Sequence, residues 1–408
     1  MAVDLLLHVV SDLCLGKPAL RSLPLSATIA DTLVALKNSD DNFLSVWSCD
    51  HSTNTTSTVD LNGGFDDHDA CRCVGKVCMV DVICYLCKED NLLSPSSALK
   101  APVSVLLPKT SGVIVHVEPS SSLVEAIDLI LQGAQNLVVP IKTKLSSRRK
   151  QVQKLTLPRN NPTTIHKNGR EFCWLTQEDI IRFLLGSIGL FSPLPAFSID
   201  SLGIINPNTI TTEYYSSASA AIASVARSLV DQTSVAVVDE GVLIGELSPH
   251  TLACCDETVA AAIATLSSGD LMAYIDCGGP PEDLVKVVVE RLKEKGLDLM
   301  LGQFVNSASS MNPSCMSLTS SSDEESPVAT LRSRSLKYSR SISYSARMAR
   351  SAEAIVCHPE SSLVAVMIQA IAHRVNYVWV TEGDGSLVGI VTFSTMLKVF
   401  RESLKSIA

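Results

Sequence analysis

One phrase occurs twice in this chain, once in its first third and again near its end. Ser121-Ser122-Leu123-Val124 returns as Ser361-Ser362-Leu363-Val364, in both places shortly after a proline. A helical pattern, two apolar strand patterns and a second helical pattern follow each copy. An internal repeat of this kind means that one supersecondary unit recurs, and this constrains the fold more than any other feature of the sequence.

Two weaker copies complete a set of four. One begins after Pro24, and the other contains two strand patterns joined by the tight turn Asp239-Glu240-Gly241. Each copy reads strand–helix–strand–strand–helix, and a unit of about 60 residues cannot bury both faces of its own small sheet. We therefore predict an α/β (α+β) fold of four βαββα repeats, with repeats one and two docked as one pair and repeats three and four as another.

The expected boundaries follow from these patterns and from shifts in composition. The segment after repeat three shows a strand pattern, Leu271–Ile275, and a helix pattern, Glu282–Glu294, and the next segment is rich in serine and poor in large apolar residues. The predicted parts are repeat one (1–90, with a polar loop at 50–70), repeat two (98–192, with a basic loop at 142–170), repeat three (193–268), an inserted strand–helix segment (269–305), a disordered serine-rich linker (306–345) and repeat four (346–408).

Composition narrows the class of protein. Hydrophobic residues make up 46% of the 408 residues, enough for packed cores, and the net charge of −9 argues against a general nucleic-acid binder. No uncharged apolar run reaches about 18 residues, so no membrane span is expected. The N-terminus carries Asp4 and Asp12 and no basic leader, so no secretory signal is expected. The 13 cysteines, an odd number, favour reduced thiols and a cytoplasmic or nuclear location, or both.

The last strand of each copy ends in a shared motif. A hydroxyl residue or its substitute is followed, three positions later, by Asp or its substitute. The four versions are Cys78 with Asp81, Thr176 with Asp179, Ser248 with Thr251, and Thr392 with Thr395. With the repeat pattern, this motif resembles that of the CBS domain, and the chain resembles two tandem CBS pairs (Bateman modules). It is similar to plant proteins that consist of little besides CBS domains, and more distantly to the γ subunits of AMP-sensing kinases.

The resemblance implies binding of an adenosine-containing ligand (AMP, ADP, ATP or S-adenosylmethionine) in a crevice between two repeats. The carboxylate of the motif would accept hydrogen bonds from the ribose diol, and the hydroxyl would lie near a phosphate at a helix N-terminus. Asp81, Cys78, Thr176 and Asp179 make the N-terminal pair the stronger candidate site. Ser248, Thr251, Thr392 and Thr395 form a weaker site without a carboxylate, to which the resemblance adds His373 and Arg374 as phosphate contacts.

A structural interpretation competes at each of these positions. A threonine followed three residues later by an acid is also an ordinary helix cap. Cys84 and Cys87 have the spacing of a zinc ligand pair, but on a predicted helix they share one buried face, which favours plain core thiols. We predict no metal site.

Two charged segments leave alternatives open. Residues 142–170 hold nine basic residues and no acid. They could bind phosphates, RNA or an acidic partner, serve as a nuclear address, or form a solvated loop. The serine-rich linker could be phosphorylated beside its arginines or act only as a tether.

No catalytic residues are predicted, because the sequence contains no nucleophile with its base, no phosphate-binding glycine loop and no HExxH motif. The preferred hypothesis is a non-catalytic regulatory protein that needs no cofactor, binds an adenosine ligand and modulates an unidentified enzyme or kinase. The alternatives are a ligand-free interaction scaffold and a subunit like the kinase γ subunits. A homodimer is compatible with either, whereas binding to nucleic acid or to a membrane is not expected.

Overall fold

The computed structural model describes residues 8–39, 41–48, 71–108, 112–141, 170–275, 281–310 and 354–407. The expected polar loop at 50–70, the basic loop except for its last residue, and the linker beyond residue 310 lie outside the described residues.

Four three-stranded sheets, each with two helices, repeat the same βαββα order. In every sheet the first strand runs parallel to the middle strand, and the third runs antiparallel to it. Repeat one comprises β1 (Ser22–Pro24), α3 (Ile29–Lys37), β2 (Phe43–Ser48), β3 (Arg72–Cys78) and α4 (Met79–Leu86). Repeat two comprises β4 (Ile114–His116), α7 (Leu123–Leu131), β5 (Asn136–Ile141), β6 (Glu171–Thr176) and α8 (Gln177–Gly186).

The second half of the chain repeats this order, so the predicted fold class is confirmed. Repeat three comprises β7 (Thr211–Glu213), α9 (Ala218–Asp231), β8 (Val235–Asp239), β9 (Val242–Leu247) and the short α10 (Pro249–Leu252). Repeat four comprises β10 (Val356–Cys357), α16 (Leu363–His373), β11 (Tyr377–Thr381), β12 (Leu387–Thr392) and α17 (Phe393–Ile407).

The repeated serine phrase marks the start of a helix in two repeats. The Ser122 hydroxyl accepts a hydrogen bond from the Glu125 N–H at 3.1 Å, and the Ser362 hydroxyl accepts one from the Ala365 N–H at 3.4 Å. The leucines that follow, Leu123 and Leu363, are fully buried. A cap next to a buried residue fixes both the start and the rotation of a helix, which accounts for the recurrence of the phrase.

The sheets dock in the predicted pairs. Between repeats one and two, Trp47, Phe172 and Trp174 form a buried aromatic cluster. Between repeats three and four, two hairpins interlock at their tips: the Leu243 N–H donates to the Gly385 carbonyl and the Leu387 N–H to the Gly241 carbonyl, both at 3.1 Å. Each pair therefore buries the sheet faces that a single repeat would leave exposed.

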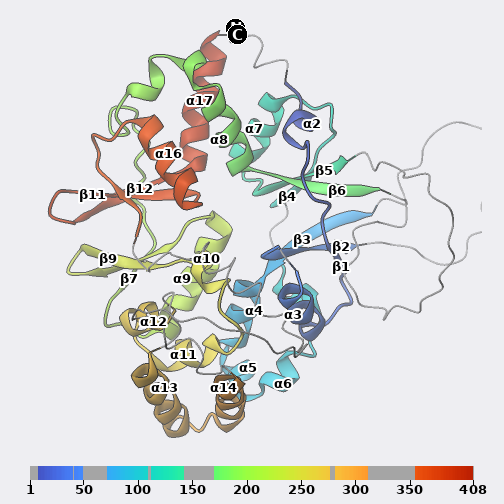
Figure 1. The fold of residues 1–408 in the computed structure, drawn as a ribbon, viewed down its shortest axis with the longest axis vertical. Helices are drawn as coiled ribbons and strands as arrows, with labels where there is room; N and C mark the ends of the chain where they lie inside the picture. Colours follow the sequence, from blue (N-terminus) through green and yellow to red (C-terminus); the bar gives the residue numbers. More distant parts are fainter. Residues whose placement is uncertain are drawn as a thin grey trace, which may run out of the picture.

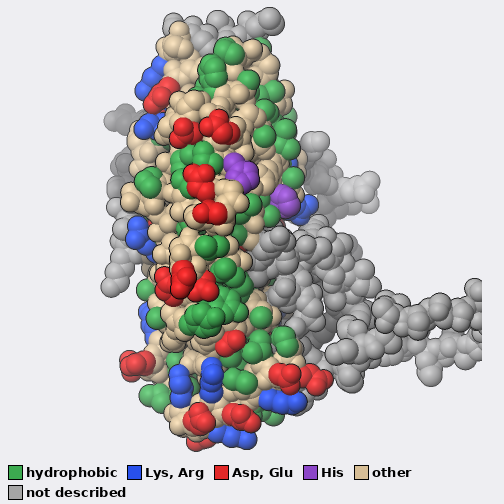
Figure 2. All heavy atoms as spheres, turned by 90° about the vertical axis from the view of Figure 1, so that its left-hand side faces the viewer, with side chains coloured by type: hydrophobic (Ala, Val, Ile, Leu, Met, Phe, Trp, Pro, Cys, Tyr) green, Lys and Arg blue, Asp and Glu red, His purple; other side chains and the backbone are tan. Residues whose placement is uncertain are grey.

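Helices join the two pairs into one flattened body. One core cluster combines α7 and α8 of repeat two with α16 and α17 of repeat four, and a second combines α4 of repeat one with α9 of repeat three. Figure 1 shows the repeats as four quadrants around a centre. Figure 2 views one edge, which is narrow and carries many acidic side chains. No described helix is long and apolar enough to cross a membrane.

A bidentate ion pair crosses the interface between repeats two and four. Arg401 Nε and Nη2 donate to the two carboxylate oxygens of Asp128 at 2.7 and 2.8 Å, and this contact lowers the pKa of Asp128. Because the pair is partly exposed, Arg401→Met should lower the free energy of unfolding by only about 1 kcal/mol. Urea unfolding at low and at high salt measures this; a loss that does not shrink in high salt would contradict an electrostatic origin.

The segment expected at 269–305 as a strand and a helix is helical throughout its described part. The predicted helix is present as α13 (Glu282–Glu294), but the predicted strand at 271–275 is wrong, because it belongs to α12 (Ser268–Ile275). Leu271, Tyr274 and Ile275 are spaced for one helix face, and the Ser267 hydroxyl accepts from the Asp270 N–H at 3.0 Å in the first turn. With α11 (Val259–Thr265), these helices pack beneath repeats one and three.

The expected linker begins later than residue 306. Helix α14 (Asp298–Ser310) occupies its first five positions. The buried side chains of Met300 and Phe304 anchor α14 to the same core. These apolar residues stop before Asn306, so the shift in composition located the end of the core but not the end of the helix.

Segments that flank each repeat cross to its neighbour. The N-terminal stretch around α2 (Val10–Leu13) lies on repeat two, where the Leu123 N–H donates to the His8 carbonyl at 3.0 Å. Conversely, the Ile29 N–H of repeat one donates to the Ala101 carbonyl at 2.9 Å. The connection between the repeats contains α5 (Glu89–Leu93), α6 (Pro95–Ala98) and a 3-10 turn, η2 (Val103–Leu106). The predicted boundaries 1–90 and 98–192 therefore enclose the strands of repeats one and two, but the segments that flank each sheet pack on the neighbouring repeat.

Candidate ligand-binding site

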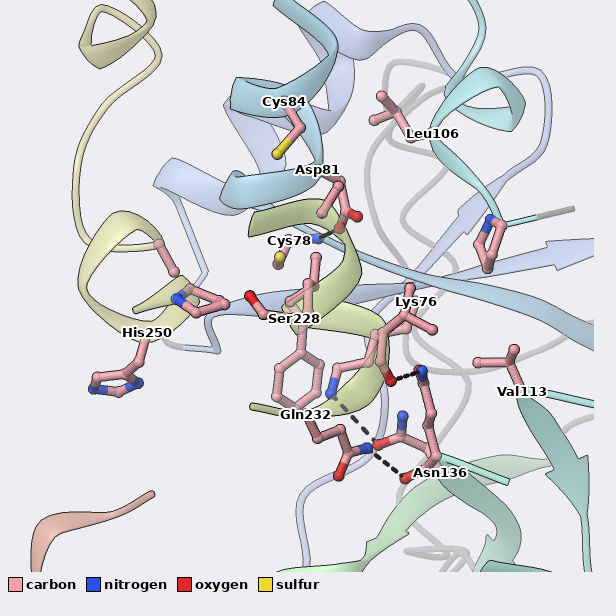
Figure 3. A pocket seen from close by; sticks show the side chains of 18 of the residues that line it. Lys76, Cys78, Asp81, Cys84, Leu106, Val113, Asn136, Ser228, Gln232 and His250 are labelled. Atoms are coloured by element: carbon pink, nitrogen blue, oxygen red, sulfur yellow. Dashed lines mark hydrogen bonds between the residues drawn. The ribbon is translucent and has the colours of Figure 1, made fainter. Parts of the chain in front are cut away.

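All four repeats line one cavity of about 1230 Å³. Its wall includes the end of β3 and the start of α4, the starts of β5 and α8, the end of α9, the start of α10 and the residues before β11 (Figure 3). At β3 and α4, and again at β6 and α8, the end of a strand and the start of the next helix lie at this cavity. The cavity is large enough for a nucleotide.

The charge of the cavity wall is opposite to that of the whole protein. Its lining includes five cationic side chains and two carboxylates, although the chain has a net charge of −9. The cations are Arg72, Lys76, Lys88, Arg182 and Arg374, and the carboxylates are Asp81 and Glu178. A concave site that concentrates positive charge raises the local concentration of anions, so it favours an anionic ligand.

Asp81 is the predicted carboxylate that the structure places in this wall. Its Oδ2 accepts from the Cys78 N–H at 2.7 Å, at the first turn of α4. Burial raises the pKa of the Asp81 carboxyl from 3.8 to about 6, while hydrogen bonds from Cys78 and the attraction of Lys76 oppose the rise. A carboxylate that faces a cavity can accept further hydrogen bonds from a diol.

Lys76 is a site residue that sequence reasoning missed. It lies on β3, two positions before the helix cap. Its ammonium donates to Asn136 Oδ1 at 3.4 Å and lies 4.1 Å from the centre of the Phe43 ring. Burial lowers the pKa of the Lys76 ammonium, and the charge of Asp81 partly offsets this effect. Figure 3 shows the side chain extended toward the amides of Asn136 and Gln232. The signal in the sequence was a lysine among the apolar residues and the glycine that make up the strand from Cys73 to Cys78.

Four thiols also line the cavity: Cys73, Cys78, Cys84 and Cys87. Burial raises the pKa of Cys78 and Cys87, and raises that of Cys84 to about 12. Thiols with raised pKa values stay protonated near pH 7 and are poor metal ligands and nucleophiles. The described residues contain no cluster of three or more metal-ligating side chains.

Asp179 does not share the cavity with Asp81. Its Oδ2 accepts from both the N–H and the hydroxyl of Thr176 at 2.7 Å, and it pairs with Lys17 Nζ at 2.5 Å. Thr176 lines the cavity, but the Asp179 carboxylate is used by the helix cap and by a lysine from the N-terminal segment. The expected cleft with one acid on either wall therefore has a single acid of the predicted pair, Asp81.

The four hydroxyl residues predicted for the weaker site are scattered. Ser248 lines the cavity, and its hydroxyl accepts from the His250 N–H at 3.2 Å. Thr392 and Thr395 cap α17 by exchanging hydrogen bonds between hydroxyls and backbone N–H groups, at 3.1 and 3.2 Å. These two threonines, Thr251 and the exposed His373 are absent from the cavity lining, whereas Arg374 is part of it.

The second pair of repeats fills its own cleft with side chains. Glu246 is buried, and its carboxylate accepts from the Tyr377 hydroxyl at 2.9 and 3.0 Å and from Trp379 Nε1 at 2.7 Å. Glu246 lies two residues before the cap Ser248, as Lys76 lies two residues before Cys78. The two pairs therefore carry opposite charges at corresponding positions, and only the lysine faces open space.

Comparison with known proteins agrees with this architecture. The CBS domain family profile matches residues 347–402, which cover repeat four. Over the full length of both chains, the protein is 53% identical to the CBS domain-containing protein CBSX5 of Arabidopsis thaliana.

The chain belongs to the CBS domain-containing proteins. A second Arabidopsis member of the family, CBSX6, is 28% identical over 97% of this chain and 94% of its own length. A solved structure from Methanocaldococcus jannaschii, described as an archaeal homologue of the AMPK γ subunit, covers 96% of this chain and 100% of its own, with 13% identity and a TM-score of 0.51. At that identity the likeness shows the fold alone. The predicted family, with four CBS repeats in two Bateman modules, is thus confirmed.

Proposed function

We propose that this CBS-domain regulatory protein binds an adenosine-containing ligand in its central cavity and transmits the occupancy of that cavity to a partner protein, with no catalytic step. The observation that carries the proposal is the cavity itself: all four repeats line it, the Asp81 carboxylate lies in its wall, and its lining is positively charged in an acidic chain.

The wall offers a complement to each part of a nucleotide. Asp81 can accept from the ribose hydroxyls, and the cations can receive phosphate. Apolar side chains that are more than a third exposed also line the cavity: Val74 (37%), Val105 (45%) and Val230 (43%). Aliphatic side chains that are left exposed inside a cavity can cover the faces of an aromatic base, so they favour a purine ring over a simple sugar phosphate.

Occupancy can change the packing of the whole protein. Because the wall draws on four repeats, a ligand gains its contacts only when the two Bateman modules hold one relative position. A ligand shifts a conformational equilibrium only by its difference in affinity for the two states, and a site shared between modules supplies such a difference. A partner that recognises one arrangement would then respond to the ligand, as expected of a sensor of nucleotide levels.

Calorimetric titration of the full chain with AMP, ADP, ATP, S-adenosylmethionine and adenosine tests the proposal. We expect saturable binding of at least one of these compounds with one ligand per chain. Absence of heat and of thermal stabilisation with all five would rule the proposal out.

One observation favours the scaffold as a second candidate. The protein's own side chains fill two of the clefts, Lys17 against Asp179 and the Glu246 cluster between repeats three and four. A rigid platform would need no ligand, so partners would bind equally well with and without nucleotide, and Asp81→Ala would leave their affinity unchanged.

A further inference from the structure

Lys76 differs in burial from every other cation of the cavity wall. Arg72, Lys88, Arg182 and Arg374 are all exposed, and Arg182 already pairs with Glu178 at 2.6 Å, whereas Lys76 is only partly accessible. The other four cations are therefore open to solvent, whereas Lys76 is more enclosed by the protein. An interior charge acts through a lower effective dielectric and contributes more to specificity than charges that water screens.

The contacts of Lys76 leave part of its hydrogen-bonding capacity unused. An ammonium has three N–H donors, and the structure gives Lys76 one long hydrogen bond, to Asn136, and the face of the Phe43 ring. Asp81 is close enough to act on the pKa of Lys76, but no ion pair within 4.0 Å joins these two described residues. The cation and the carboxylate thus stand apart in one cavity.

At the corresponding position of the other module, the protein itself supplies hydrogen-bond partners to the charged side chain. Glu246 receives its donors from Tyr377 and Trp379, which fill the space around it. The residues opposite the helix caps of repeats one and two are Phe43 and Asn136, and neither offers a carboxylate to Lys76. Enclosing an ammonium without a paired negative charge costs free energy, and an anion from outside the chain would offset that cost.

We propose that Lys76 is the residue that selects the ligand by its phosphate, so that the cavity takes a phosphorylated adenosine nucleotide rather than adenosine or the cationic S-adenosylmethionine. This inference rests on the proposed function and specifies its ligand class. Asp81 would hold the ribose while the phosphate displaces the weak Lys76–Asn136 hydrogen bond.

The test compares ligands across three variants of the full chain, with ATP, AMP, adenosine and S-adenosylmethionine as the titrants. Lys76→Met keeps the aliphatic stem and removes the charge, Lys76→Arg restores a charge, and Lys100→Met removes an exposed cation that does not line the cavity, as the matched control. We expect Lys76→Met to weaken ATP and AMP by roughly 10- to 100-fold and to leave adenosine unchanged. Lys76→Arg should recover most of the loss, and Lys100→Met should change the affinities less than threefold.

The possible results separate this inference from the function on which it rests. If the wild type binds none of the four compounds, the proposed function fails and the inference falls with it. If the wild type binds S-adenosylmethionine or adenosine as tightly as ATP, the cavity is an adenosine site and the role of Lys76 is refuted. Equal weakening of ATP and adenosine in Lys76→Met would indicate damage to the fold and would also refute it. Circular dichroism and melting curves verify that each variant is folded.

Discussion

Asp81→Asn is expected to make the ligand-free protein more stable and its ligand affinity lower. At pH 7.5 the buried Asp81 carboxylate is ionised against the effect of desolvation, which raises its pKa to about 6. An asparagine carries no charge, and its side-chain oxygen can still accept from the Cys78 N–H. We expect the free energy of unfolding to rise by about 2 kcal/mol. Nucleotide affinity should fall by about 100-fold, because the charged acceptor for the ribose hydroxyls is lost.

The difference in the free energy of unfolding between the wild type and Asp81→Asn should depend on pH, in a direction set by the raised pKa of Asp81. The folded-state pKa of Asp81 lies above its ordinary value of 3.8, so the folded state binds more protons than the unfolded state between about pH 4 and pH 6. The wild type therefore loses stability relative to Asp81→Asn as the pH rises through this window, and the difference is constant above it. Urea unfolding of both proteins from pH 4 to pH 8 measures this difference in the free energy of unfolding. A difference that stayed the same over the whole range would contradict the assignment of the effect to Asp81.

Asp179→Asn is the matched control. Asp179 occupies the same motif position but pairs with Lys17 and is absent from the cavity lining. This variant should lose about 1 kcal/mol of stability and keep its ligand affinity. If both variants lost ligand binding equally, the site would involve both carboxylates, as the motif alone predicts, and our placement of the ligand would be wrong.

Tyr377→Phe should lower the free energy of unfolding by about 2–3 kcal/mol. The Tyr377 hydroxyl donates to both oxygens of the buried Glu246 carboxylate, at 2.9 and 3.0 Å. Phenylalanine keeps the ring and removes only this donor, so the cost arises from a buried charge that is left with fewer hydrogen bonds. Chemical unfolding measures the loss, and we expect Glu246→Gln, which removes the charge, to recover part of it in the double variant.

Tyr214→Phe serves as the comparison. The Tyr214 ring is packed so closely on Gly269 that a Cβ there would come within 2.3 Å of it, yet no hydrogen bond from the Tyr214 hydroxyl is described. Loss of this hydroxyl should change stability by less than about 0.5 kcal/mol. A similar loss in both variants would show that the Glu246 network adds nothing beyond packing.

The repeats could be predicted from sequence because their signals are local. A serine cap followed by Leu123 or Leu363, and an apolar strand followed by Thr176 or Thr392, each depend on residues within one turn or one strand. The same logic fails for short apolar runs, as at Leu271–Ile275, where helix and strand spacings overlap in five residues. A helix cap at Ser267 and the spacing of Leu271 and Tyr274 were the deciding clues.

The site could be predicted only in part, because its residues come from four repeats. Four residues of the motif, Cys78, Asp81, Thr176 and Ser248, lie at junctions of strands and helices and line the cavity; their role in binding a ligand stays a prediction. The motif could not indicate that Lys17, more than 150 positions away, lies against Asp179. Nor could it show that Lys76 faces open space while Glu246 is enclosed by Tyr377 and Trp379.

The sequence alone determined the four βαββα units, their pairing and the acidic balance of the chain, because caps, periodicity and composition act over short distances along the chain. The tertiary structure decided which of the equivalent motifs remains open to a ligand. Similar repeats become different sites because distant segments surround them differently. Lys17 supplies a counter-charge to Asp179, and Tyr377 and Trp379 fill the space around Glu246. Asp81 and Lys76 are left facing the cavity.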